Sequence, residues 1–388
     1  MRDQKNGLLY EFAMFCFKCA AKILRQRPHL NGKEYLKNVP TPVIFTVTHD
    51  SYFEVPSLSK VYYSLKPRPR FLIMAKDEFL SKQYLSTNFP SVNPVIKKIF
   101  QLLDRTGLPH ALFRKLRLVT IHRPFIEQYT KEKETVHQEI GQQLDNIGDS
   151  VSQGFSTLIF PEGTTWGYGG LKKIRSGIYQ LVSNTYETYR KRMYILPINV
   201  KVDRCIKGAK DVFINIGKPG FLMAQRDEFI SRLDSILRSL HTITFSQIAS
   251  YYLKELAEST EKTISISKNE FYHKMDDIIS HCLNSNAREF LPRIDQRLAR
   301  RRYMLRKIRG FLRFCVSKDF LIEKKPRKGN AMFVINTEKL LGTYNRKTYR
   351  KMNPVGYSAN ELISLGEETL AYLFDMPRKE SPHAVLSR

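Results

Sequence analysis

Short runs of β-branched, aromatic and other apolar residues recur between residues 43 and 240, and longer amphipathic stretches separate them. Each run has the length and composition of a buried strand. Apolar residues recur at helical spacing in 127–151 and again in 229–240. This alternation of strands and helices predicts an α/β domain. The predicted strands are 43–47, 71–75, 118–121, 155–159, 194–200 and 212–216.

The segment before the first predicted strand has a different pattern. Residues 8–24 are rich in Leu, Phe, Ala and Cys, and three charged residues interrupt them. The pattern predicts, within residues 1–27, an amphipathic helix that packs on the domain or lies on a membrane surface. No run reaches the roughly 18 uninterrupted apolar residues of a membrane span. Residues 27–38 are polar and are predicted to form a loop.

A second amphipathic segment lies within residues 93–117. It combines an apolar helical stripe with basic residues around it. A solvated basic face over the core and contact with an anionic bilayer are both compatible with this pattern. The basic residues are Lys97, Lys98, Arg105, Arg114, Lys115 and Arg117.

Residues 243–388 lack the strand–helix alternation, and we predict a mainly helical, basic C-terminal region after a domain formed by residues 1–242. Its most basic part is 293–313, where nine Arg or Lys residues are opposed by Asp295 alone. Apolar residues in this segment keep roughly heptad spacing. It is compatible with the solvated face of a helical domain, with a membrane-surface helix, and with a site for a nucleic-acid or protein partner.

The charge balance points to an anionic partner. The chain has 388 residues, and 64 Lys and Arg against 37 Asp and Glu give a formal net charge of +27. The five cysteines lack the spacing of a zinc site or a disulfide framework. The N-terminus lacks the cleavage pattern of a signal peptide. We therefore expect a cytoplasmic location, peripheral on the inner face of a membrane.

Candidate chemistry lies where predicted strands end. His49 follows the strand 43–47, and Glu54 lies five residues further on. The two side chains can meet only if the chain turns from strand into helix between them. Phe-Pro-Glu-Gly-Thr-Thr at 160–165 follows the strand 155–159. The ends of strands in open α/β sheets are where ligands bind. The glycine-rich segment 167–170 lacks the spacing of a phosphate-binding P-loop.

Four motifs in fixed order resemble those of the 1-acyl-sn-glycerol-3-phosphate acyltransferase family, the glycerolipid acyltransferases. Thr-His-Asp-Ser-Tyr-Phe-Glu at 48–54 resembles the family's His-x4-Asp motif. The segment 118–123, which ends in Arg123, resembles its Arg-ending strand, and 160–164 matches its Phe-Pro-Glu-Gly-Thr motif. The segment 195–198 is similar to its Pro-containing strand. The resemblance covers about residues 28–240 and implies a mixed sheet flanked by helices.

The sequence departs from the family in a few places. Glu54 stands where the family usually has Asp, and Thr48 replaces the usual Asn. A Glu at position 54 keeps the carboxylate but adds a methylene, so His49 must sit slightly differently. Thr165 and Trp166 also replace the usual residues, and the link 80–117 is longer.

The resemblance implies acyl transfer from an acyl thioester to a hydroxyl, with His49 as general base held by Glu54. Arg123 would bind the phosphate of the acceptor, and Glu162 with Gly163 and Thr164 would position its hydroxyl. Second candidates for binding phosphate or an acidic carrier are Lys172, Lys173 and Arg175. No acyl-enzyme, metal or redox cofactor is implied.

The expected partners are an anionic membrane surface, a lysophospholipid acceptor, and acyl-CoA or acyl carrier protein as donor. Lysophosphatidic acid leads the acceptors, followed by glycerol 3-phosphate and other lysophospholipids. A competing interpretation is a non-catalytic or divergent lipid-binding module with a partner-binding C-terminal region, which the Glu at position 54 keeps open. A nucleic-acid-binding protein is a third interpretation, and it is not favoured because it rests on charge alone.

Overall fold

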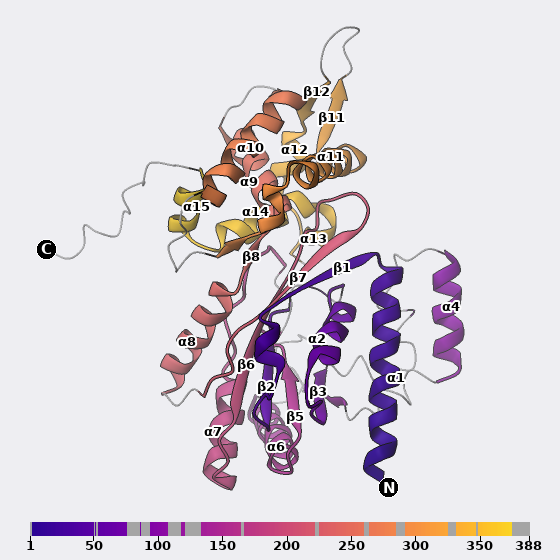
Figure 1. The fold of residues 1–388 in the computed structure, drawn as a ribbon, viewed down its shortest axis with the longest axis vertical. Coiled ribbons are helices and arrows are strands. Elements are labelled where there is room, and N and C mark those ends of the chain that lie inside the picture. Colours follow the sequence, from indigo (N-terminus) through magenta and orange to yellow (C-terminus); the bar gives the residue numbers. More distant parts are fainter. Residues whose placement is uncertain are drawn as a thin grey trace, which may run out of the picture.

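The computed structural model places a sheet-based region, formed by the first two thirds of the chain, below a C-terminal region stacked on one end of it (Figure 1). The elements are numbered as in Figure 1. The structure describes residues 2–49, 51, 53–75, 86, 94–107, 118–120, 133–163, 167–221, 225–259, 264–284, 292–324, 331–346 and 348–374.

The sheet-based region has seven strands in the order β1-β7-β6-β2-β5-β3-β4. Neighbouring strands are parallel except for β6 and β7, which are antiparallel. The predicted mixed sheet is therefore confirmed. The strands are β1 (Gln26–Asn31), β2 (Val43–Val47), β3 (Phe71–Ala75), β4 (Leu118–Thr120), β5 (Ser156–Ile159), β6 (Tyr194–Val202) and β7 (Lys210–Ile216).

Helices cover both faces of this sheet, because the strands are apolar on both sides. Phe45 of β2 packs with residues of α1 and α2, whereas its neighbour Ile44 packs on the opposite face with residues of α6, α7 and α8. The helices are α1 (Arg2–Ile23), α2 (Ser59–Ser64), α4 (Pro94–Arg105), α6 (Lys133–Ser152), α7 (Gly177–Tyr189) and α8 (Arg226–Ser239), with short 3-10 helices η1 (Lys33–Leu36) and η2 (Val55–Leu58).

The prediction of a loop over residues 27–38 was wrong for its first part. Strand β1 pairs in parallel with β7 at the edge of the sheet. Polar side chains are tolerated there because they find partners on β7. His29 Nε2 lies 2.6 Å from Asp211 Oδ1, and Asn31 donates to Asn215 at 2.7 Å. An edge strand of this kind carries no apolar alternation for sequence analysis to detect.

The C-terminal region has its own apolar core, built from α9, α10, α11 and α14. The core also includes Cys205 and Ile206, from the connection between β6 and β7. Its elements are β8 (Thr242–Ile243), α9 (Phe245–Glu258), β9 (Ser265–Ser267), α10 (Lys268–Asn284), β10 (Arg293–Ile294), η4 (Gln296–Ala299), α11 (Arg301–Ser317), β11 (Leu321–Lys324), β12 (Met332–Ile335), α12 (Thr337–Leu341), α13 (Tyr349–Met352), α14 (Pro354–Ile363) and α15 (Glu367–Phe374).

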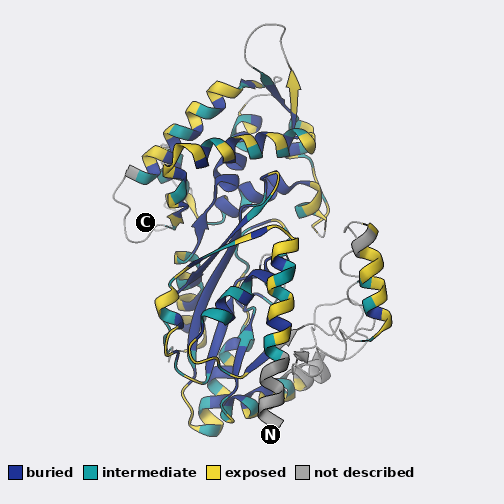
Figure 2. Cartoon of the chain, turned by 45° about the vertical axis from the view of Figure 1, so that its right-hand side comes forward, coloured by how far each residue is buried: buried dark blue, intermediate teal, exposed yellow. Residues whose placement is uncertain are grey.

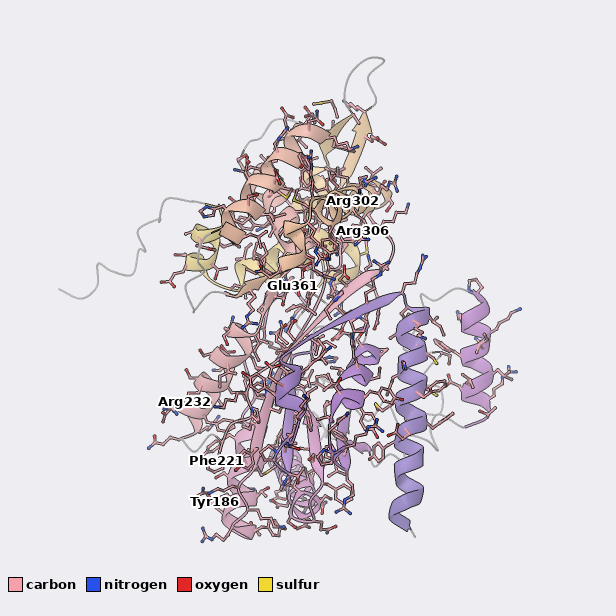
Figure 3. All side chains as sticks on the ribbon, in the orientation of Figure 1. Tyr186, Phe221, Arg232, Arg302, Arg306 and Glu361 are labelled. Atoms are coloured by element: carbon pink, nitrogen blue, oxygen red, sulfur yellow. The ribbon has the colours of Figure 1, made fainter. Side chains whose placement is uncertain are left out.

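Helix α11 occupies most of the basic segment 293–313. Its apolar side is buried in the C-terminal core, at Met304, Ile308, Phe311 and Leu312 among others. The apolar stripe is therefore not available to a bilayer, and the first interpretation of this segment, a solvated face of a helical domain, describes the helix. The arginines of this helix that remain exposed are Arg301, Arg302, Arg306, Arg309 and Arg313. Figure 3 labels Arg302 and Arg306 among them.

Helices α1 and α4 lie on the same flank of the molecule (Figure 1), and Figure 2 shows exposed positions along both of them. Phe12, Phe15 and Ile23 of α1 are each more than half exposed. On α4, Leu102 is 63% exposed. Among the helices that the structure describes, none is both long enough and apolar enough to cross a bilayer. The second half of the segment 93–117 lies outside the described residues.

Candidate active site

His49 lies at the carboxyl end of the sheet, two residues after strand β2. After the last residue of the strand, Thr48 continues the pairing with β6. Its backbone N–H donates to the Ile198 carbonyl at 3.0 Å, and its hydroxyl accepts from the Val200 N–H at 2.9 Å. The Thr found here in place of Asn therefore fixes the backbone next to His49. The imidazole itself is buried, with 6% of the residue exposed.

The structure brings His49 and Glu54 together. Nδ1 of His49 lies 3.5 Å from Oε1 of Glu54. The chain makes the turn that this contact requires, because η2 begins directly after Glu54. A distance of 3.5 Å is at the outer limit of a direct hydrogen bond, and catalytic hydrogen bonds often shorten only when substrate binds.

Ser51 holds the carboxylate of Glu54. The Ser51 N–H donates to Glu54 Oε1 at 2.6 Å, and the Ser51 hydroxyl donates to Oε2 at 2.5 Å. Glu54 is 1% exposed, so these two bonds replace the water that its charge has lost. Sequence analysis did not assign this role to Ser51. The Ser-x-x-Glu spacing was the available signal, because it is the pattern of a capping box, in which a Glu side chain bonds the backbone three residues earlier.

A tight turn carries Glu162. The Gly163 N–H donates to the Phe160 carbonyl at 2.9 Å, and Gly163 has a φ of +70°, a conformation that favours glycine. The Phe160 ring packs on the imidazole of His49, with the ring centres 4.3 Å apart. The Pro-Glu-Gly turn at the end of β5 therefore lies beside the end of β2.

Both carboxylate oxygens of Glu162 accept backbone hydrogen bonds. Oε1 accepts from the N–H of His49 at 2.9 Å, and Oε2 accepts from the N–H of Lys172 at 3.0 Å. Glu162 is 2% exposed. Burial raises its pKa to about 7, although the two N–H donors and the charge of Lys201 act in the opposite direction. Glu162 thus joins the His49 loop to the loop after the turn.

The basic candidates downstream are arranged over this turn. Besides the Lys172 bond to Glu162, the N–H of Arg175 donates to the Pro161 carbonyl at 2.9 Å. The Arg175 side chain passes close to Gly163, since a Cβ at that glycine would lie 3.5 Å from Arg175 Cγ. Lys173 and Arg175 are exposed. Arg123 and Thr164 lie outside the described residues, so their predicted roles stay predictions.

The arrangement is suited to proton transfer. A histidine whose Nδ1 faces a fixed, buried carboxylate is held in one orientation, and its charged form is stabilised when it takes a proton at the other ring nitrogen. Exposed basic side chains near the same turn are suited to an anionic substrate.

Comparison with known proteins gives two results. Residues 27–201 match the model of the family described as Acyltransferase. Among solved structures, the crystal structure of the 1-acyl-sn-glycerophosphate (LPA) acyltransferase PlsC from Thermotoga maritima is similar. The sequence identity is 13% and the TM-score is 0.40, over 61% of this chain and 81% of that one. No curated protein matches the chain.

The family match spans His49, Glu54 and the turn that carries Glu162. It therefore includes the residues that the fold brings together at the ends of β2 and β5, and it includes the strands that position them. Residues 27–201, somewhat less than half of the chain, therefore match the acyltransferase family, as the order of their motifs predicted.

Proposed function

We propose that this protein transfers a fatty acyl group from an acyl thioester to the hydroxyl of lysophosphatidic acid or a related glycerolipid. The observation that carries the proposal is the pair His49 and Glu54, 3.5 Å apart at the end of β2. The pair provides a positioned general base, and the family match provides the reaction class.

The chemistry needs one proton carrier. His49 removes the proton of the acceptor hydroxyl while the hydroxyl oxygen attacks the thioester carbonyl. When the carbon–sulfur bond breaks, the sulfur leaves as a thiolate, and the imidazolium returns the proton to it. The products are an ester and a free thiol, so the base is regenerated without an acyl-enzyme. Glu54 stabilises the imidazolium that forms between the two steps.

The remaining candidates bind the acceptor. Arg123 binds its phosphate, because a guanidinium matches phosphate in bidentate geometry. Lys172, Lys173 and Arg175 bind the phosphate or the acidic donor carrier, and Glu162 with Gly163 and Thr164 positions the hydroxyl. The two backbone bonds of Glu162 support an additional role, which is to fix the His49 backbone.

We further propose that the protein works as a peripheral enzyme on the cytoplasmic, anionic face of a membrane. The exposed apolar side chains of α1 and α4 support this, together with the exposed Lys18, Lys22, Lys97 and Lys98 beside them.

The experiment that tests the function is acyl transfer to lysophosphatidic acid in liposomes, with acyl-CoA and acyl carrier protein offered separately. We expect transfer by the wild type and a loss of at least 100-fold in His49→Ala, with the fold retained by circular dichroism. His281→Ala is the control, because His281 lies on α10 in the C-terminal region, away from the site. Wild-type protein that acylates neither lysophospholipids nor glycerol 3-phosphate would favour the binding-module interpretation instead.

A further inference from the structure

The C-terminal region packs against the loop that follows the Pro-Glu-Gly turn. Three glycines of this loop have no room for a side chain. A Cβ at Gly167 would lie 2.4 Å from the Arg346 carbonyl oxygen, one at Gly169 would lie 2.5 Å from the Tyr357 carbonyl oxygen, and one at Gly170 would lie 2.5 Å from Ser364. The glycine-rich segment 167–170 is thus a place of close backbone approach between the two regions.

Asn360 of α14 fixes the same loop by a hydrogen bond. Its Nδ2 donates to the Tyr168 carbonyl at 2.9 Å. The Tyr168 ring also packs against the Tyr349 ring, with the centres 5.3 Å apart. Two residues after the last loop glycine comes Lys172, whose N–H donates to Glu162. The position of the loop therefore determines one of the two backbone partners of Glu162.

Glu361, the next residue of α14, contacts Lys201 near the end of β6. Its Oε1 pairs with Nζ of Lys201 at 2.9 Å, and both side chains are buried. Figure 3 shows Glu361 where the C-terminal region meets the upper end of the sheet. Lys201 lies near the end of β6, and its positive charge acts on Glu162. The other carboxylate oxygen of Glu361 accepts from Gln247 at 3.3 Å.

We propose that Asn360 and Glu361 of α14 are positioning residues for acyl transfer, so that the C-terminal region forms part of the enzyme's working site. Asn360 holds the loop 167–173, which carries the basic substrate-binding candidates. Glu361 balances the charge of Lys201 behind Glu162. This inference rests on the proposed function, and it assigns to residues beyond the family match a part in the same reaction.

Asn360→Ala tests the loop contact, with Asn184→Ala as the matched control. Asn184 also donates one side-chain hydrogen bond, to Asp145 at 3.3 Å, but it lies on α7 away from the loop. We expect Asn360→Ala to raise the KM for the acceptor about threefold to tenfold, as the loss of one hydrogen bond implies. We also expect faster amide hydrogen exchange in 167–173. Asn184→Ala should change neither quantity.

Glu361→Gln tests the charge contact through the pH profile of kcat/KM. The groups that act on Glu162 are the N–H donors of His49 and Lys172, the charge of Lys201, and the His49 imidazole. Without the Glu361 charge, Lys201 favours the ionised form of Glu162, the form that accepts both N–H bonds. The acidic limb should move to lower pH by roughly half a unit to one unit. A merely structural defect would lower activity by the same factor at every pH.

The remaining outcomes separate the two proposals. In a Glu162→Gln background the carboxyl on which Lys201 acts is gone, so adding Glu361→Gln should leave the shape of the pH profile unchanged. The wild type could transfer acyl groups while Asn360→Ala and Asn184→Ala have the same KM and the same amide exchange, and while Glu361→Gln leaves the acidic limb unshifted. This outcome overturns the inference and leaves the proposed function standing. Absence of transfer by the wild type overturns both.

Discussion

The carboxylate of Glu162 accepts a hydrogen bond from the backbone N–H of His49 at 2.9 Å, across a sequence separation of 113 residues. The turn after β5 and the end of β2 are thus tied together by a charged group that water barely reaches. Ionised Glu162 satisfies two N–H donors, yet burial favours its protonated form. Ionised Glu162 therefore fixes the backbone at His49. Burying its charge lowers the free energy of unfolding of the protein.

This cost can be measured as a pH dependence of stability. The pKa of Glu162 is about 7 in the fold and lies near its ordinary value when the chain is unfolded. The folded state therefore binds the proton more tightly, so stability is fully present below the unfolded pKa and is lost as pH rises through 7. Between pH 5.5 and pH 8 the wild type should lose about 2 kcal/mol relative to Glu162→Gln, from 1.36 kcal/mol per unit. Denaturant unfolding of both proteins measures the difference.

Because every other titrating group is present in both proteins, the comparison isolates Glu162. Parallel stability profiles of the two proteins between pH 5.5 and pH 8 would show that Glu162 is already ionised throughout this range.

The contact between His49 and Glu54 predicts how substitutions at position 54 rank. Glu54→Gln keeps the shape but removes the charge that stabilises an imidazolium, so we expect kcat to fall about 100-fold or more. Glu54→Asp keeps the charge but withdraws it from Ser51 and from His49, so a smaller loss of about tenfold is expected. Steady-state kinetics with lysophosphatidic acid rank the two variants. If Gln were tolerated better than Asp, geometry rather than charge would be the contribution of this residue.

Ser51 provides a test of the absence of an acyl-enzyme. Its hydroxyl donates to Glu54, so Ser51→Ala removes one bond to the carboxylate and should lower kcat about threefold to tenfold. A nucleophilic serine would instead be indispensable and would carry an acyl group during turnover. Intact-protein mass spectrometry of wild type mixed with acyl thioester distinguishes the two, because an adduct that disappears in Ser51→Ala contradicts direct transfer without an acyl-enzyme.

Elements whose structure is determined by a local pattern could be predicted from the sequence. The central strands are continuous apolar runs, and the helices covering the sheet have apolar stripes, so the fold class followed from periodicity. Strand β1 was not predicted, because its polar residues form hydrogen bonds with residues of β7 that only the tertiary fold brings near. The meeting of His49 with Glu54 was anticipated, since it depends on a turn within one short segment. The bonds from the backbone N–H groups of His49 and Lys172 to Glu162 were not anticipated, because a backbone donor carries no residue-specific signal.

The C-terminal region shows the same limit. The charge of segment 293–313 was visible, but not which of its basic residues are buried. Lys307 on α11 is 3% exposed and pairs with Asp203 and Asp211, so it faces inward among apolar neighbours. Asp203 directly follows β6, and Asp211 lies at the start of β7. Only the packing of α11 onto that connection distinguishes this lysine from its exposed neighbours.

The buried position of Lys307 predicts a large effect on stability. Lys307→Met leaves two carboxylates without their shared cation, and breaking a buried pair of this kind costs about 3–5 kcal/mol. Arg232→Met is the control, because Arg232 pairs with Glu228 on the surface and such pairs contribute about 1 kcal/mol or less. Urea unfolding measures both. A cost for Lys307→Met as small as that of the control would mean that the charge of Arg297 and the hydrogen bond from Tyr303, both of which reach Asp211, stabilise the cluster without Lys307.

The exposed apolar residues of α1 predict where the protein meets a membrane. Phe12 and Phe15 are 53% and 55% exposed and lie one turn apart, so both can enter the headgroup region together. Replacing both with Ser should weaken binding to anionic liposomes about 10-fold to 100-fold. Full burial of an aromatic side chain contributes about 1.5–3 kcal/mol, and each of these rings has about half of its surface left to bury. The control is Arg309→Ala with Arg313→Ala, on the exposed side of α11, which removes charge without removing apolar surface. Flotation at low and high salt separates the two contributions. Retained binding in the Ser variant together with loss in the Arg variant would place the docking surface on the C-terminal region.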